Sequence, residues 1–468
     1  MKPFIHLFET PKNYYFYDVN RNENVQVSQK VYGYLERVLN DDVREEGKDL
    51  DIEKEIRMLK ENGYLSDNQV KEIKHLGTDL LPLYLARKMN ILTIQLTQNC
   101  NLRCSYCAYT SNNGTNRLHQ NKKVDLNIAK KAILMLRDNS IDSNKLSIGF
   151  YGGEPLLEFD LIKEIVRFCK KELIGREVNY TITTNSTLLS DEILEFFERE
   201  NFQIVLSLDG PKKINDKNRK FLQGNDSVYD KVIKNIKKIE KEYKKLFKNL
   251  TINMVIDPTQ NFNDYQELFI QNPLLNKVKI MATLVDNDYK EVEYTATELF
   301  NKQYGENRYK YYLYYLGKIE LENKKFFSAL FQQNYKELLG GHRRAYSLGK
   351  TACPSGPCIP GKQRLMVDVN GMFYPCERIS ETDENNIIGN IDRGIELNKS
   401  IEVMNIARQN EEECKKCFAF RYCGLCIKAY EEGKVQDQRL KNKCQSTRNG
   451  FHNHLMEMEF IRETSDLA

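Results

Sequence analysis

The sequence contains no apolar run that approaches the roughly 20 residues needed to span a bilayer. Its first residues, Met1-Lys2-Pro3-Phe4, do not lead into the apolar core that secretory signal peptides carry. From these two absences we expect neither a membrane-spanning protein nor a secreted one. We therefore expect a cytoplasmic protein with no membrane partner.

A strong excess of charge of one sign is also missing. The 70 Lys and Arg residues nearly balance the 66 Asp and Glu residues, and the formal net charge is +4. Because nucleic-acid-binding domains carry a basic excess, we expect no nucleic-acid partner. Hydrophobic residues make up 41% and charged residues 29% of the chain, which predicts a packed globular protein. The length of 468 residues corresponds to roughly three domains of about 150 residues each.

Twelve cysteines in a cytoplasmic protein indicate metal binding rather than disulfides. Three of them, Cys100, Cys104 and Cys107, follow an alternating apolar run over 91–96, which predicts a strand and a cysteine loop that leaves it. Three thiolates on one loop hold three corners of a cubane iron–sulfur cluster and leave the fourth iron open to a ligand. The alternative is a zinc loop, because thiolates also bind zinc. Structural zinc, however, prefers paired C-x2-C units and four protein ligands.

From the same run onward, apolar strand patterns alternate with helical patterns. Strands are predicted over 91–96, 146–151, 179–184, 203–208, 250–256 and 278–284, and helices most clearly over 128–137, 161–173 and 191–200. Six such repeats predict an α/β fold with parallel strands joined by right-handed crossovers. In such folds the functional site lies at the carboxyl ends of the strands.

Polar residues follow three of these strands. Gly152-Gly153-Glu154 comes after the second strand, where two glycines allow the main chain to approach a ligand closely and Glu154 offers a carboxylate to an ammonium group. Asn185 ends the third strand, Ser207 and Asp209 end the fourth, and Arg219 lies on a nearby loop. Each residue taken alone is also compatible with an ordinary turn.

Eight further cysteines lie near the C-terminus, in the order Cys353, Cys358, Cys376, Cys414, Cys417, Cys423, Cys426 and Cys444. Eight thiolates suffice for two four-iron clusters and equally for two zinc ions. Between them, Asn370-Gly371 separates two apolar runs and predicts a hairpin. The remaining cysteine, Cys169, lies within an apolar helical pattern and is interpreted as a buried core thiol.

Residues 1–88 precede the alternating pattern. They predict strands over 4–8, 14–18 and 24–27, a helix capped by Ser28, and a second helix over 51–62 that stops at Gly63. An extended peptide could pair with the edge of such a sheet. The alternative is an accessory domain that only packs on the rest of the chain or mediates dimerisation.

The spacing C-x3-C-x-aromatic-C, with Tyr106 as the aromatic residue, resembles the signature of radical S-adenosylmethionine (SAM) enzymes. The resemblance implies a partial (β/α)6 TIM-type barrel in which SAM binds the open iron and is cleaved to a 5′-deoxyadenosyl radical. It implies a catalytic role for Cys100, Cys104, Cys107 and Asp209. It also implies that SAM is bound by Tyr106, Gly152, Gly153, Glu154, Asn185, Ser207 and Arg219.

The order of the eight later cysteines resembles the SPASM domain of radical SAM peptide-modifying enzymes, which holds two auxiliary [4Fe-4S] clusters. The resemblance assigns Cys353, Cys358, Cys376 and Cys426 to the first auxiliary cluster. It assigns Cys414, Cys417, Cys423 and Cys444 to the second. The family usually has C-x3-C at the last pair, whereas two residues separate Cys423 from Cys426 here. Cys426 therefore either completes the first cluster or leaves one of its irons open to a peptide thiol.

The resemblance extends over nearly the whole chain. It implies a winged-helix-like leader-peptide recognition domain (1–88), a radical SAM partial barrel (89–288), a helical bridge (289–350) and a SPASM iron–sulfur domain (351–468). Within this family the chain resembles maturases that form thioether cross-links in Cys-rich peptides, the sactipeptide and ranthipeptide types. The expected cofactors are SAM and three [4Fe-4S] clusters. The expected partners are a Cys-rich precursor peptide with a leader and a reducing electron donor of the flavodoxin or ferredoxin type.

Two alternatives to this function stay open. The first is another radical SAM/SPASM enzyme, which links two carbons of a peptide or oxidises a cysteine or serine of a target protein to formylglycine. The second is a zinc-binding protein without catalysis, because C-x2-C units alone do not distinguish zinc from iron.

Overall fold

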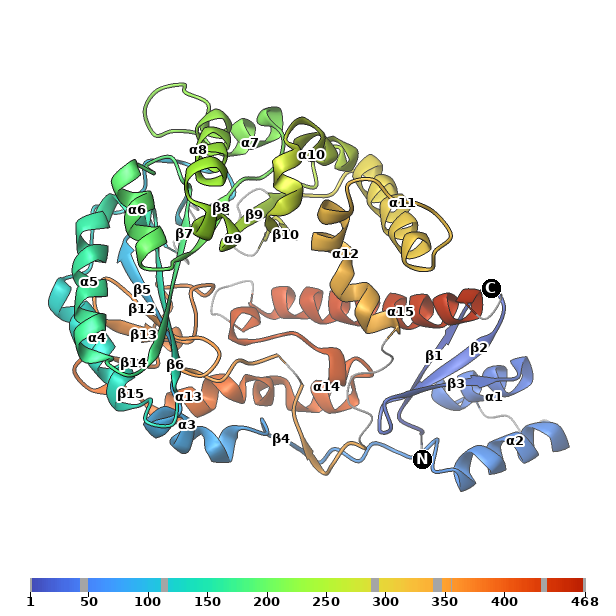
Figure 1. Ribbon diagram of the computed structural model, residues 1–468. Helices are drawn as coiled ribbons and strands as arrows, with labels where there is room; N and C mark the ends of the chain where they lie inside the picture. The colour runs from blue at the N-terminus through green and yellow to red at the C-terminus, as the bar shows by residue number, and fades with distance from the viewer. Residues whose placement is uncertain are drawn as a thin grey trace. The chain divides into compact units, whose positions relative to one another are not determined.

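The six runs predicted as strands all form strands of one sheet (Figure 1). Their bounds are β5 Ile91–Thr97, β6 Lys145–Gly152, β7 Glu177–Thr184, β8 Gln203–Ser207, β9 Leu250–Ile256 and β10 Lys279–Leu284. Each strand is parallel to the next, and they follow one another in chain order across the sheet. The predicted parallel arrangement is confirmed, and it brings the carboxyl ends of all six strands to one edge.

The structure is a computed structural model that describes residues 2–42, 49–110, 117–287, 294–339, 347–354, 356–430 and 436–465. The chain divides into two compact units. The barrel unit consists of Leu80–Gln332 and Cys358–Ile401, and the terminal unit consists of Met1–Asp79, Gln333–Pro357 and Glu402–Ala468. The division into four domains stays a prediction from the sequence.

Helices cover the outer side of the sheet in the barrel unit. Figure 1 shows α4 (Leu126–Asp138), α5 (Phe159–Glu172) and α6 (Asp191–Arg199) along β5, β6 and β7. Helix α5 buries Ile162, Ile165, Val166 and Cys169, a spacing that forms one apolar stripe along a helix. Cys169 is fully buried, so its interpretation as a core thiol is confirmed.

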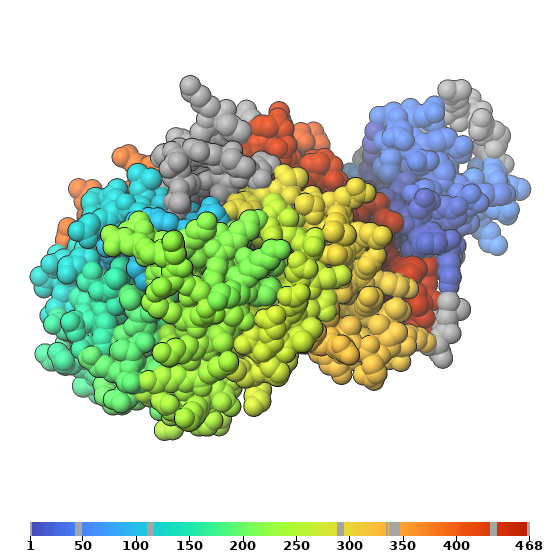
Figure 2. Space-filling model, turned by 90° about the horizontal axis from the view of Figure 1, so that it is seen from above, coloured from blue at the N-terminus to red at the C-terminus, as the bar shows by residue number. Residues whose placement is uncertain are grey.

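Further helices follow β8, β9 and β10. They are α7 Lys212–Asn218, α8 Val228–Glu242, α9 Lys244–Lys248, α10 Glu267–Gln271, α11 Glu298–Tyr315 and α12 Lys324–Leu339. The segments that contain α8, α10 and α11 form one continuous surface in green and yellow (Figure 2). Tyr304 of α11 contacts the rings of Phe262 and Phe331 at centroid distances of 5.3 and 5.2 Å, so this tyrosine-rich segment is a packed helix.

The sheet continues beyond β5 into the later part of the chain. Strand β12 (Met366–Val367) is parallel to β5, and β13 (Met372–Tyr374), β14 (Gly389–Asn390) and β15 (Gly394–Ile395) follow as antiparallel strands. The predicted hairpin at Asn370-Gly371 is confirmed. Gly371 has a φ of +83°, a conformation that favours glycine, and its N–H donates to the Asp368 carbonyl over 3.1 Å.

A buried ion pair connects the start of the barrel to this extension. Arg117 Nε lies 2.7 Å from Glu381 Oε1, and the two side chains are 2% and 6% exposed. Gln95 of β5 donates from Nε2 to the same carboxylate over 2.6 Å. The Arg117 guanidinium also donates to the main-chain carbonyls of Glu377 and Ile379. The pair therefore fixes the segment after Cys376 against the first strand of the barrel.

The terminal unit begins with an antiparallel sheet of β1 (Ile5–Glu9), β2 (Tyr14–Asp18) and β3 (Glu23–Val27), followed by α1 (Gln29–Leu39) and α2 (Leu50–Glu61). These elements confirm the predicted strands and helices. Ser28 caps α1 by accepting a hydrogen bond from the Val31 N–H over 3.3 Å. Phe16 of β2 packs against Val31, Leu35 and Ile56 in the core between the sheet and the two helices.

The opposite face of this sheet packs against α15 (Gln436–Ser465). Because side chains alternate between the faces of a strand, Tyr17 points away from Phe16 and meets the ring of Phe451 at 5.2 Å. His6 Nε2 and His452 Nδ1 are 2.9 Å apart. The remaining strands and α-helices of the two units are β4 Glu72–Ile73, α3 Leu81–Arg87, β11 Thr351–Ala352, α13 Leu397–Met404 and α14 Glu411–Lys416. Across the described ranges, every helix is too short or too polar to span a bilayer.

Replacing Arg117 by Met should lower the free energy of unfolding by about 3–5 kcal/mol, because the Glu381 carboxylate stays buried without its charged partner. Urea unfolding followed by circular dichroism measures this change. The double variant Arg117→Met/Glu381→Leu should recover most of the loss, because it removes the two charges together.

The matched control is Arg87→Met, which breaks an ion pair on the surface of the same unit. Arg87 Nη2 lies 2.8 Å from Asp142 Oδ1, and the two side chains are 46% and 34% exposed. Its cost should stay within about 1 kcal/mol. Equal losses for the two single variants would show that burial of the Arg117 pair has no special effect on stability.

Candidate functional site

The cysteine loop leaves the carboxyl end of β5, as the sequence predicts. Within it, Cys100 Sγ accepts a hydrogen bond from the Leu102 N–H over 3.3 Å, and the Cys107 N–H donates to the Cys104 carbonyl over 3.1 Å. The loop is held to the segment after β8, because the main-chain N–H of Ser105 donates to the Asn218 carbonyl over 2.9 Å. The three thiols therefore lie on a loop that is held by its own hydrogen bonds and by this contact with Asn218.

The thiols of this loop lie close enough to influence one another. Burial raises the pKa of Cys100 to about 12, and the Cys107 thiol and the Glu154 carboxylate act in the same direction. Burial also raises the pKa of Cys104, while the Arg219 guanidinium opposes that shift. Such thiols become thiolates when a metal supplies positive charge, so the donor set fits iron.

Among the described residues, no three His, Cys, Asp or Glu side chains converge on a point that would hold a single metal ion. A cubane cluster does not require such convergence, because each thiolate binds a different iron. All twelve cysteines are described, and none of them forms a disulfide.

Two glycines bring the end of β6 into main-chain contact with the cysteine loop. A Cβ atom at Gly152 would lie 2.2 Å from the Thr97 carbonyl oxygen, and one at Gly153 would lie 2.1 Å from the Asn99 carbonyl oxygen. The N–H groups of Gly153 and Glu154 donate to the same two carbonyls over 2.8 and 2.9 Å. The sequence predicted a close approach to a ligand at these glycines, and the structure shows a close approach to the loop that carries the cysteines.

Glu154 is a fully buried carboxylate beside this loop. Its Oε1 accepts hydrogen bonds from Thr184 Oγ1 over 2.6 Å and from the Leu156 N–H over 3.1 Å, and its Oε2 accepts from the Asn185 N–H over 2.8 Å. Burial raises its pKa to about 6, against the lowering effect of these hydrogen bonds. Glu154 is therefore largely ionised at neutral pH, and it connects the carboxyl ends of β6 and β7.

Asn185 holds the end of β7 against the cysteine loop. Its Nδ2 donates to Asn101 Oδ1 over 2.8 Å and lies 3.9 Å from Cys100 Sγ. The next residue, Ser186, has a φ of +60°, an uncommon conformation for a residue other than glycine. The main chain therefore turns sharply where the predicted site residue contacts the loop.

Buried Asp209 and Arg219, together with half-buried Tyr106, form a second group beside the cysteines. Arg219 donates from Nε to Asp209 Oδ2 over 2.8 Å and from Nη2 to Asp209 Oδ1 over 3.2 Å. The Tyr106 hydroxyl donates to the same carboxylate, and Arg219 Nη1 lies 3.9 Å from Cys104 Sγ. Ser207, the last residue of β8, is buried and pairs with Asn253. The resemblance predicts that Arg219 contacts SAM, whereas the structure shows Arg219 in a two-point ion pair with Asp209.

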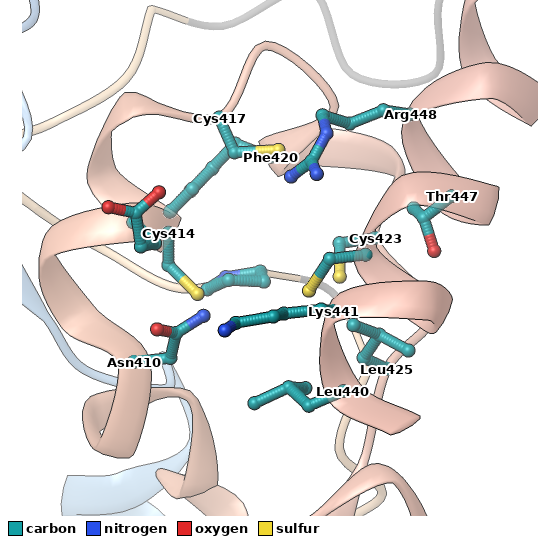
Figure 3. A pocket seen from close by; sticks show the side chains of 13 residues that line it. Asn410, Cys414, Cys417, Phe420, Cys423, Leu425, Leu440, Lys441, Thr447 and Arg448 are labelled. Carbon is teal, nitrogen blue, oxygen red and sulfur yellow. The ribbon is translucent and has the colours of Figure 1, made fainter. Parts of the chain in front are cut away.

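A second cysteine site lies wholly within the terminal unit. Cys414, Cys417, Cys423 and Cys444 line one cavity of about 240 Å³ (Figure 3). They come from α14, the segment after it and α15. Burial raises the pKa of Cys414 to about 12 and that of Cys423 to about 11. The four thiols predicted to hold one auxiliary cluster are thus brought together around a space of their own.

The other four predicted auxiliary ligands are divided between the units. Cys353 and Cys426 belong to the terminal unit, whereas Cys358 and Cys376 belong to the barrel unit. Within the terminal unit, Cys353 and Cys426 lie near enough to Cys423 for electrostatic interaction with it. The assignment of these four residues to one cluster stays a prediction.

Sequence reasoning missed two cations that line the cavity with the four thiols, Lys441 and Arg448. Helical spacing could have found them, because residues three before and four after Cys444 share its face of a helix. It also missed the Arg117–Glu381 pair, for which the sequence carries no local signal.

Comparison with known proteins agrees with this geometry. Residues 94–270 match the family model of the Radical SAM superfamily, a range that includes the cysteine loop, Glu154 and Arg219. The chain is 26% identical over 396 residues to a cysteine-type anaerobic sulfatase-maturating enzyme of Clostridium perfringens, which covers 78% of this chain and 95% of that enzyme. It is 22% identical over 391 residues to the radical SAM cyclopropyl synthase TigE of Paramaledivibacter caminithermalis, covering 80% of this chain and 76% of that enzyme.

A solved structure has the same fold. It is native anSMEcpe with bound AdoMet and the Cp18Cys peptide, with a TM-score of 0.55 at 20% sequence identity, and the match covers 78% of this chain and 98% of that one. The α/β fold with a parallel sheet is therefore shared with that enzyme. Together with the cysteine loop and its surroundings, these similarities identify the chain as a radical SAM enzyme, a family whose members use SAM and a [4Fe-4S] cluster.

Proposed function

We propose that this radical SAM enzyme is a peptide maturase that installs thioether cross-links, from a Cys sulfur to an acceptor carbon, in a ribosomally made Cys-rich precursor peptide. The observation that carries the proposal is the β3 edge of the N-terminal sheet, where β3 pairs with β2 alone among the described strands. This edge belongs to the same unit as a cavity lined by four thiols. An enzyme that couples leader binding to electron transfer needs these two features. The name of one relative, a sulfatase-maturating enzyme, and the peptide bound in the solved structure of the same fold support chemistry on a polypeptide.

In this proposal, Cys100, Cys104 and Cys107 hold the cluster at which SAM is cleaved, which supplies a radical that abstracts hydrogen. Glu154, ionised at neutral pH, would face the ammonium group of SAM with Asn185 beside it. Asp209 would orient Tyr106 and Arg219 through its two carboxylate oxygens. Gly152, Gly153 and Ser207 complete the proposed SAM site.

The C-terminal cysteines would form a SPASM domain with two auxiliary [4Fe-4S] clusters. Cys414, Cys417, Cys423 and Cys444 would hold one of them in their shared cavity. Cys353, Cys358, Cys376 and Cys426 would hold the other. An electron donor of the flavodoxin or ferredoxin type would reduce the enzyme.

The outer edge of β3 is the proposed leader site, and the hydrogen bonds show which groups it offers. Thr10 N–H donates to the Asn13 carbonyl and Val19 N–H donates to the Phe4 carbonyl, so the odd-numbered residues of β2 direct their main chain toward β1. Because this direction alternates along a strand, the even-numbered residues of β2 pair with the odd-numbered residues of β3. The main-chain groups of Gln26 therefore point outward, where an extended peptide would pair.

A cavity of about 480 Å³ lies beside this edge. Its lining carries charges of both signs, with Lys12 and Arg462 positive and Glu459 and Glu463 negative. Asn24 Nδ2 donates to Glu459 Oε1 over 2.6 Å, so the strand and α15 form one continuous wall. A leader paired with β3 would place polar side chains against this wall.

A second candidate is oxidation of a cysteine in a target protein to formylglycine, which the names of the sulfatase-maturating relatives favour. The products distinguish the candidates. A thioether removes two hydrogens per link and leaves no thiol to alkylate, a carbon–carbon link leaves the thiol, and formylglycine reacts with hydrazides. The neighbourhood of the gene should be searched for a short reading frame that encodes a Cys-rich peptide, and that peptide is the substrate to test by mass spectrometry.

The variant Cys100→Ala/Cys104→Ala/Cys107→Ala should abolish reductive SAM cleavage, because no thiolate is left on the loop to bind the SAM cluster. Chromatography of 5′-deoxyadenosine after reduction measures cleavage. Iron and sulfide bound by the C-terminal cysteines should remain, whereas bound zinc without sulfide would support the non-catalytic alternative. Cleavage that persists in the triple variant would contradict the assignment of this loop.

The variant Gln26→Pro should weaken binding of the precursor peptide at least about tenfold, because proline removes the outward N–H that a leader strand would use. The main-chain hydrogen bonds between β3 and β2 should stay intact, since Pro is tolerated on edge strands. Gln26→Ala is the matched control, because it keeps the N–H and should bind nearly as well as the wild type. Fluorescence anisotropy of a labelled leader measures the affinity, and equal affinity for the two variants argues against strand pairing at β3.

A further inference from the structure

Two cationic side chains enter the cavity that the four thiols of the terminal unit surround. In Figure 3, Arg448 and Lys441 extend from α15 into this space, with the Arg448 guanidinium directed toward Cys417 and Cys423. Cys444 lies on the same helix, between them in sequence. Because residues three and four apart share one face of a helix, the geometry of α15 presents a ligand and two cations to the cavity together.

The balance of charge in the cavity wall is positive. Glu413 also lines the cavity. Burial raises the pKa of Cys444, the Arg448 guanidinium opposes that shift, and the Glu413 carboxylate adds to it. Asn410 and Thr447 contribute neutral polar groups. Two cations and one carboxylate therefore face the thiols.

This excess of positive charge has a direct consequence for a cluster in the cavity. A [4Fe-4S] cluster with four thiolates carries net negative charge, and reduction adds one more electron. Its reduction potential depends on the net charge around it, on hydrogen bonds to its sulfurs and on exposure. Cations in the wall stabilise the reduced form and make the potential less negative.

We propose that Arg448, assisted by Lys441, sets the reduction potential of the auxiliary cluster held by Cys414, Cys417, Cys423 and Cys444, and so makes this cluster an electron acceptor. The inference rests on the proposed function. It extends that function by naming the residues that favour transfer of an electron to this cluster.

The electron balance of thioether formation shows where this matters. The acceptor carbon loses a hydrogen atom to the radical derived from SAM, the peptide thiol loses its proton, and the sulfur–carbon bond forms with release of one electron. That electron needs a one-electron acceptor, and the auxiliary cluster is reduced by taking it up. A less negative potential makes this step more favourable.

The experiment is a redox titration of the full-length, anaerobically reconstituted protein, followed by electron paramagnetic resonance. The variant Cys414→Ala/Cys417→Ala identifies the signal of the cluster by its loss. In Arg448→Gln, the ratio of reduced to oxidised cluster at a fixed potential should fall about tenfold, which corresponds to about 59 mV for a one-electron couple. Arg448→Lys keeps the charge and should shift less.

The matched control is Lys443→Gln, which removes a positive charge from the same helix next to Cys444. Lys443 is a described residue outside the cavity lining, so the potential should stay unchanged. If Arg448→Gln loses its cluster iron, Lys441→Gln tests the same effect, and a shift to more negative potential supports the proposal.

Two results would contradict the proposal, and each of them would contradict a different part of it. Unchanged potentials in variants that keep the cluster would overturn the role of Arg448 and Lys441 alone. Unchanged iron, sulfide and spectra in Cys414→Ala/Cys417→Ala would show that the cavity holds no cluster, which overturns this part of the proposed function as well.

Discussion

The main-chain contact between the end of β6 and the cysteine loop is the constraint on which the site depends. Gly152 and Gly153 lie so close to the carbonyls of Thr97 and Asn99 that no side chain fits between them. This contact places Glu154 beneath the loop, where Thr184 and Asn185 fix its carboxylate. The cysteines, the acidic group and the end of β7 are thus positioned by two residues that have no side chain.

The parts of the fold that depend on short-range pattern could be predicted from the sequence. Alternating apolar residues predicted every strand of the parallel sheet, and Ser28 and Gly371 predicted a helix start and a hairpin. The cysteine loop could be located because its three cysteines lie close together in the chain. The pairing of Arg219 with Asp209 could not be predicted, because an arginine at this position could equally bind the carboxylate of a ligand.

Contacts between distant parts of the chain were beyond the reach of the sequence. The loop between Cys417 and Cys423 packs on the N-terminal sheet, where Phe418 stacks on His6 at 3.6 Å and Arg421 donates to the Val19 carbonyl over 2.8 Å. A ring stacking contact and a hydrogen bond to a main-chain carbonyl have no recognisable sequence pattern in either of the two segments that they join. They join a region interpreted as a peptide-binding domain to one interpreted as an iron–sulfur domain within the same unit.

Helix α15 gives this unit an order of assembly during protein synthesis. It covers one face of the N-terminal sheet through Phe451 and His452 and supplies Cys444, yet it is translated after all the strands it touches. Chains leave the ribosome from the N-terminus onward. One face of the N-terminal sheet therefore stays without α15 while β5 to β10 are synthesised. Cys444 is also the last of the four cavity thiols to be synthesised. Closure of the sheet and completion of the cysteine cavity therefore both depend on α15, the last of the described helices to be made.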